Sequence, residues 1–125
     1  MSHFSAEQVN RLILAAYNGE DRTEYMHDDS TPSFRYIVTG HVQGTGASWE
    51  LIRTYPRRFA AIVREWARAV GSNAETLGVW HDSGHVYIDA GDTVSHRAVA
   101  LRRAERFGEQ AIFDRVENRV IHVGE

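Results

Sequence analysis

The densest set of possible metal ligands lies around one predicted hairpin. This set comprises His81, Asp82, His85, Asp89, Asp92 and His96. If the turn places His81 opposite His85, both imidazoles and the Asp89 carboxylate share one face, a reasonable ligand set for zinc or iron(II). The alternative is that these side chains only face solvent, with Asp82 fixing the turn. A metal-dependent enzyme using His81, His85 and Asp89 is therefore an alternative hypothesis, because spacing alone is weak support for ligands.

Arginines are the second group of residues with chemistry to offer. All 14 basic residues are arginine and the chain has no lysine, which GC-rich codon usage explains and selection against lysine-directed tagging would also explain. The spacing of Arg57, Arg64 and Arg68 puts them on one face of a predicted helix, where they could meet phosphates. A solvated helix face is the simpler interpretation because the net charge is −3.

Acidic residues gather near the N-terminus. Residues 20–31 (EDRTEYMHDDST) lack hydrophobic periodicity and precede Pro32, which predicts a loop. A basic partner could bind this loop through its carboxylates, which are those of Glu20, Asp21, Glu24, Asp28 and Asp29. A loop that only aids solubility is the alternative.

Other catalytic signatures are missing from the sequence. The absence of cysteine excludes disulfides, thiolate catalysis and Cys-ligated zinc. Without lysine, Gly44-Thr45-Gly46 cannot be a P-loop and no lysine Schiff base can form. The chain has no nucleophile elbow and no recognisable pair of catalytic carboxylates. We therefore expect action by association and not by turnover, with no cofactor.

The elements that position these residues are clearest at 77–122. Two runs rich in Val, Ile, Trp and Tyr flank Asp82-Ser83-Gly84, which is typical of a hairpin. Gly91-Asp92 is predicted to break the second strand, and Ser95 to cap the helix that follows. The expected ββαββ order is a hairpin at 77–90, a helix at about 96–107 and strands at 110–114 and 119–123.

The last third of the chain carries a pattern of core and turn residues. The pattern comprises Gly78-Val79-Trp80-His81-Asp82, Val86-Tyr87-Ile88-Asp89, Arg97 with Ala100, Gln110-Ala111-Ile112-Phe113-Asp114 and Ile121. It resembles a module found in small uncharacterised proteins of GC-rich Gram-positive bacteria and their phages. Those proteins often have an acidic residue where this chain has His96. The resemblance implies a phage or mobile-element origin and transfers no activity.

The first half of the chain predicts further helices and strands. Ser5 and Gln8 have the spacing of a capping box, and Pro56 suits the first turn of a helix. Trp66 and Trp80 are expected in the hydrophobic core. The expected elements are helices at about 6–18 and 56–70 and strands at Phe34–Thr39 and Ala47–Arg53.

Together these elements predict an α+β fold with a mainly antiparallel sheet of four to six strands and three helices. We expect a single domain over 1–125, divided into 1–33, 34–71 and the 77–122 core. The sequence has neither a leader nor an apolar run of the roughly 20 residues that span a bilayer, so we expect a cytoplasmic protein with no membrane partner.

The leading functional hypothesis is a small accessory or interaction protein, phage- or mobile-element-encoded, that binds a host or phage macromolecule. A protein partner is favoured over nucleic acid, since the chain is acidic overall. A nucleic-acid-binding module using the arginine-rich helix faces remains an alternative.

Overall fold

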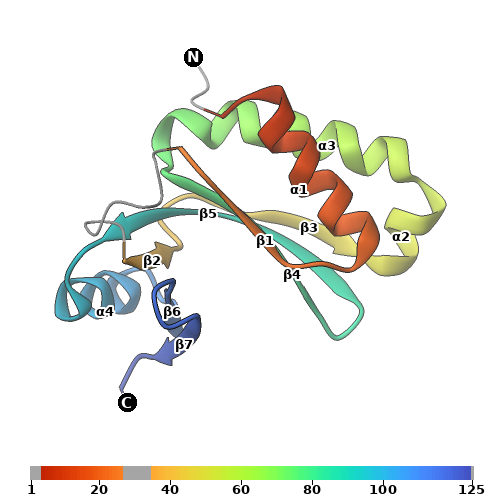
Figure 1. Ribbon diagram of the computed structural model, residues 1–125. Coiled ribbons are helices and arrows are strands. Elements are labelled where there is room, and N and C mark those ends of the chain that lie inside the picture. The colour runs from red at the N-terminus through yellow and green to blue at the C-terminus, as the bar shows by residue number, and fades with distance from the viewer. Residues whose placement is uncertain (1–3, 27–34, 125) are drawn as a thin grey trace.

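The structure is a computed structural model that describes residues 4–26 and 35–124, and it shows the expected α+β fold (Figure 1). The helices are α1 (Ala6–Asn18), α2 (Trp49–Thr54), α3 (Pro56–Val70), the 3₁₀ helix η2 (Gly71–Asn73) and α4 (Arg97–Arg106). The strands are β1 (Arg22–Tyr25), β2 (Tyr36–Thr39), β3 (Thr45–Ser48), β4 (Thr76–Asp82), β5 (His85–Val94), β6 (Ala111–Asp114) and β7 (Arg119–His122). The described residues thus form seven strands and four α-helices, one of each more than the sequence predicted.

The long strand β5 organises the sheet. The strand order is β1-β4-β5-β2-β6-β7, β3 also pairs with β5, and every strand pair among the described residues is antiparallel. β2 and β3 share one edge of β5, with Thr39 opposite Gly91 and Thr45 opposite Ile88. Five residues separate Thr39 from Thr45 but only two separate Ile88 from Gly91. The chain therefore bulges out of the sheet between β2 and β3.

Helix α1 forms as its end signals predict. The Ser5 side chain accepts a hydrogen bond from the Gln8 N–H, while the Gln8 side chain accepts one from the Ser5 N–H. Gly19 ends the helix in the left-handed conformation, with φ 72°. Between these caps the buried stripe includes Leu12 and Ala16, which fixes the face that packs on the sheet.

The larger hydrophobic core lies between the sheet and the pair α1 and α3. Figure 1 shows these two helices side by side over the end of the sheet that contains β1, β3, β4 and the first half of β5. Alternate residues of the hairpin point into this core, namely Leu77, Val79, Val86, Ile88 and Ala90. Each fully buried aliphatic side chain of this kind contributes roughly 1.5–3 kcal/mol to folding.

A second core forms at the other end of the sheet, under α4. It is built from Tyr36, Val38, Val94, Ala100, Ala104, Ile112 and Ile121. The ion pair of Arg35 with Asp114 fastens this end, because Arg35 precedes β2 and Asp114 ends β6. Two guanidinium nitrogens of Arg35 donate to the two Asp114 oxygens at 3.1 and 2.9 Å. The β6–β7 hairpin is thereby tied to the sheet by charge as well as by its ladder.

Some local expectations are wrong. Residues 22–25 of the expected acidic loop form β1, which pairs with β4. The segment predicted as a strand at 47–53 is mostly α2, capped by the Ser48 side chain on the Leu51 N–H. β5 continues through Gly91-Asp92 because β2 and β4 pair with it there. In each case tertiary pairing or a local cap overrides the pattern read from sequence.

The predicted burial of the tryptophans is also wrong. Trp80 is 41% exposed, on the side of the hairpin away from α1 and α3. Trp66 is only partly buried, and its Nε1 donates to the Gln43 carbonyl at 2.8 Å. The face of α3 that enters the core carries Phe59 and Val63 with alanines, while Ile62 on the same helix is exposed. Large-to-small substitution of Trp66 should therefore cost less than a full core truncation.

We predict that Asp114→Asn destabilises the protein at neutral pH. Asparagine retains the Oδ1 that accepts the Val116 and Glu117 N–H groups, so the substitution isolates the ion pair with Arg35. We expect a loss of about 1.5 kcal/mol, the lower end for hydrogen bonds to charged groups because Arg35 is partly solvated.

The effect should depend on pH in a defined direction. The hydrogen bond from Arg35 lowers the pKa of Asp114, burial opposes this, and the Glu117 and Val116 N–H groups lower it further. A lowered folded-state pKa contributes stability that is present above the unfolded value of about 3.9 and is lost as the pH falls through the folded value. Urea denaturation at pH 7 and pH 3 measures the free energy of unfolding of wild type and variant. The difference between the two proteins should be smaller at pH 3 than at pH 7. A larger difference at pH 3 would contradict a lowered pKa of Asp114 in the folded protein.

Candidate functional site

The register of the β4–β5 hairpin separates the two histidines predicted as a metal pair. His85 lies opposite Asp82 and His81 lies opposite Val86, so the histidines point to different sides of the sheet. The His81 ring lies against α1, with Nδ1 3.1 Å from Asp21 Oδ1 and Nε2 3.2 Å from the Ala16 carbonyl oxygen. The prediction that both imidazoles share one face is wrong. Within residues 4–26 and 35–124, no three histidine or carboxylate side chains gather as a metal site.

The acidic residues of the expected binding loop differ in exposure and in their partners. Glu20 is exposed, and Asp21, also exposed, accepts hydrogen bonds from the backbone and ring of His81. Glu24 is only 5% exposed and lies between Arg11 of α1 and Arg22 of β1. Asp28 and Asp29 lie outside the described residues. Glu24 is thus a structural ion-pair residue, and its expected place on an accessible acidic loop is wrong.

Burial and pairing act in opposite directions on Glu24. Burial raises the pKa of its carboxyl, but hydrogen bonds from Arg11 and Arg22 outweigh burial, and the net pKa is lowered. The Arg11 side chain donates through two nitrogens, with its shortest contact at 2.7 Å. Glu24 therefore stays ionised at neutral pH, and its charge links α1 to the edge strand β1.

The three arginines predicted to share a face are all exposed on α3, but they do not act as one set. Arg64 and Arg68 border a cleft between α1 and α3, whereas Arg57 lies two helical turns before Arg64 and does not line it. Arg64 donates to Asn10 Oδ1 across the cleft at 3.3 Å. Arg68 follows Arg64 by four residues, so it lies about one helical turn further along the same side of α3.

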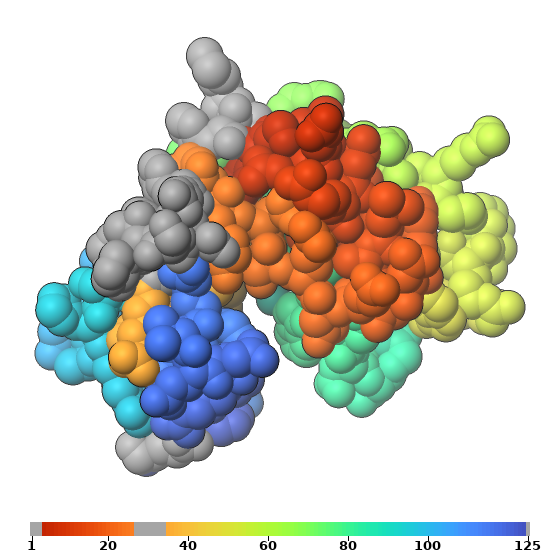
Figure 2. Space-filling model, in the orientation of Figure 1, coloured from red at the N-terminus to blue at the C-terminus, as the bar shows by residue number. Residues whose placement is uncertain are grey.

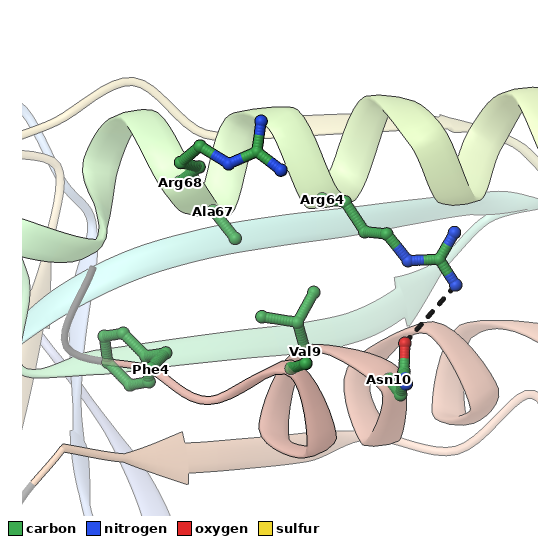
Figure 3. A pocket seen from close by; sticks show the side chains of 7 residues that line it. Phe4, Val9, Asn10, Arg64, Ala67 and Arg68 are labelled. Atoms are coloured by element: carbon green, nitrogen blue, oxygen red, sulfur yellow. Dashed lines mark hydrogen bonds between the residues drawn. The ribbon is translucent and has the colours of Figure 1, made fainter. Parts of the chain in front are cut away.

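This α1–α3 cleft has a volume of about 220 Å³. Its lining consists of Phe4, Ala6, Val9, Asn10, Arg64, Ala67 and Arg68. Figure 3 shows Phe4 and Val9 on one wall facing Ala67 on the other, with Arg64 reaching over to Asn10 at one end. The cleft therefore combines an apolar interior with two cationic groups at its rim.

Sequence reasoning found the arginines of this cleft but not its walls. Phe4, Val9 and Asn10 belong to no motif that indicates a binding site. The gap exists because Ala6 and Ala67 are too small to fill the space between the two helices. Only the packing distance of α1 and α3 reveals such a gap, so no sequence signal could have identified it.

Comparisons with known proteins add no assignment to this geometry. No family model, curated protein or solved structure matches the chain. Among the helices of the described part of the chain, none has both the length and the apolar character needed to cross a bilayer.

We predict that Glu24→Gln and Glu20→Gln have different effects, although both residues were expected in one acidic loop. Glu24→Gln leaves Arg11 and Arg22 without their anion, and we expect a loss of about 2–4 kcal/mol, somewhat below the range for breaking a fully buried pair. Glu20→Gln should change stability by less than about 0.5 kcal/mol, as for other exposed positions. Chemical denaturation at pH 7 measures both values. Equal effects would mean that Glu24 is solvated like Glu20.

Proposed function

We propose that the protein is a cytoplasmic interaction protein that binds a protein partner through the α1–α3 cleft. The observation that carries this proposal is the pairing of two guanidinium groups, Arg64 and Arg68, with an apolar interior lined by Phe4, Val9 and Ala67. Cytoplasmic placement and a phage or mobile-element origin rest on the sequence expectations alone.

The size of the cleft supports a side chain of a macromolecule as its occupant. Sites for cofactors and drug-sized ligands usually enclose about 300–1,000 Å³. A volume of 220 Å³ is below that range and suits one or two amino-acid side chains. Protein interfaces are commonly anchored by a few side chains that fill pockets of this kind.

The charge of the rim supports an acidic partner segment. Guanidinium groups form short, two-pronged hydrogen bonds with carboxylates, which gives both affinity and orientation. An apolar side chain of the partner would enter between Val9 and Ala67, and a neighbouring carboxylate would meet Arg64 or Arg68. The partner is therefore expected to present an aliphatic or aromatic residue next to an aspartate or glutamate.

Nucleic acid is the competing occupant for these arginines. Phosphate contacts alone would use Arg57 together with Arg64 and Arg68 and would not need the apolar interior. Such binding falls steeply with salt and depends little on the apolar part of the ligand. An oligonucleotide of mixed sequence, used as a competitor, separates this alternative from the peptide proposal.

The proposal can be tested with ¹⁵N-labelled protein and a short peptide in which aspartate and leucine alternate. We expect chemical-shift changes at Phe4, Val9 and Ala67, and weaker binding as salt is raised because the rim charges become screened. Two analogue peptides, with asparagine for aspartate or serine for leucine, should each bind at least about tenfold more weakly, a difference of about 1.4 kcal/mol.

Matched arginine variants complete this experiment. The double variant Arg64→Gln/Arg68→Gln should lose at least about tenfold in affinity, and Arg57→Gln should bind as wild type does. All three positions are exposed, so folding stability should change by less than about 0.5 kcal/mol. Unchanged peptide binding in the double variant, or displacement of the peptide by the oligonucleotide with equal dependence on Arg57, would overturn the proposal.

A further inference from the structure

The side of the β4–β5 hairpin that faces away from α1 and α3 carries a row of aromatic rings. Trp80 lies directly opposite Tyr87, and their ring centroids are 4.3 Å apart with an interplanar angle of 19°. The ring of His85 follows at 6.1 Å from Tyr87, at 29°. Trp80 remains 41% exposed although one of its faces is stacked. Stacked aromatic rings on a regular sheet form a rigid surface. Their side chains lose little conformational entropy when a ligand binds to them.

Two glycines lie next to these rings. Gly78 lies on the same side of β4, and Gly46 of β3 lies opposite Tyr87. A Cβ atom at Gly46 would come within 2.3 Å of the Val86 carbonyl oxygen, so this position cannot hold a side chain while β3 pairs as it does. The aromatic rings therefore stand beside two positions, Gly46 and Gly78, that add no side chain to cover them.

Apart from His85, the polar side chains next to Trp80 and Tyr87 are acidic. Asp82 and Asp89 lie on the same side of the hairpin as Trp80, and the Trp80 Nε1–H donates to Asp89 Oδ2. Residues 76–94, which form the two strands, contain no arginine. We call Trp80, Tyr87, Asp82 and Asp89 the aromatic–carboxylate face.

We propose that the aromatic–carboxylate face binds an arginine-containing basic segment of a protein partner. The guanidinium group would lie over the exposed face of the Trp80 indole, where the ring quadrupole attracts a cation. Asp89, held in place by the indole N–H, would accept one hydrogen bond from it, and Asp82 on the same side of the hairpin would add a second negative charge. The planar, weakly hydrated guanidinium suits this combination of stacking and charge better than an ammonium group.

Charge decides between this occupant and single-stranded nucleic acid, which also stacks on exposed aromatic rings. Phosphates would meet Asp82 and Asp89 without an arginine on these two strands to neutralise them. Figure 1 shows the tip of the β4–β5 hairpin projecting beyond the helices. Figure 2 shows an indentation between this green hairpin tip and the blue C-terminal strands, so a segment of chain has room to approach there.

This inference is independent of the proposed function. The α1–α3 cleft presents arginines and lies on the helix side of the sheet, whereas the aromatic–carboxylate face presents carboxylates on the other side of the hairpin. A partner segment of one charge would not be shared between the two surfaces. Variants at one surface should therefore leave binding at the other unchanged.

The test uses the full-length ¹⁵N-labelled protein and a short, flexible peptide with two arginines between glycines. Its matched control is the same peptide with citrulline, which keeps the shape of arginine but lacks the charge. We expect shift changes at the Trp80 indole N–H, assigned with Trp80→Phe, and at the backbone of Gly46 and Tyr87. The citrulline peptide should bind at least about tenfold more weakly.

Isosteric carboxylate variants complete the test without removing the aromatic rings. The double variant Asp82→Asn/Asp89→Asn should bind the arginine peptide at least about tenfold more weakly, while Glu105→Gln on the exposed side of α4 should bind as wild type does. Arg64→Gln/Arg68→Gln should also bind it as wild type does, and Asp82→Asn/Asp89→Asn should still bind the aspartate–leucine peptide. Equal affinity for the citrulline peptide, or unchanged affinity in the carboxylate variant, would overturn the inference.

Discussion

The hydrogen-bonding capacity of β5 is the constraint on which the rest of the structure depends. One edge of this strand pairs with β4, and the other edge pairs with β3 in its first half and β2 in its second half. At Gly91, where β5 pairs with both β2 and β4, a Cβ atom would lie 2.8 Å from Thr76 Oγ1 and 2.9 Å from the Val38 carbonyl oxygen. The bulge between β2 and β3 lets both strands satisfy the same edge of β5. It also turns His41 inward, where Nε2 donates to the Asn73 carbonyl at 2.7 Å.

This arrangement divides the hydrophobic core in two and leaves two kinds of surface. The first half of β5 faces α1 and α3, and the second half faces α4. Ion pairs hold the margins: Glu24 with Arg11 at the edge strand β1, and Asp114 with Arg35 beside β2. The surface on the helix side is cationic at the α1–α3 cleft, and the surface on the other side of the hairpin is anionic and aromatic. A rigid sheet with unlike charges on its two sides is suited to contacting more than one partner segment.

The errors of sequence reasoning share one physical origin. The alternation of apolar and polar residues along the second strand of the hairpin, β5, indicates which of its residues share a side, but the turn decides the register. A shift of one residue from the expected pairing places His81 on the opposite side from His85. Glu24 looked like a loop carboxylate because its partners, Arg11 and Arg22, flank it only after β1 has paired with β4. Trp80 looked like a core residue because hydrophobicity does not reveal which side of a strand is covered.

The sequence by itself determined the elements whose signals are local. The capping box at Ser5, the proline that opens α3, the glycine after α1 and the ββαββ order of the last third all follow from contacts within a few residues. Only the tertiary structure decided which surfaces stay open. The cleft between α1 and α3 depends on how closely two helices pack, and the exposure of Trp80 depends on the absence of a covering element among the described residues. Both are properties of distant segments brought together, and a single sequence encodes such contacts only through the energy of the whole fold.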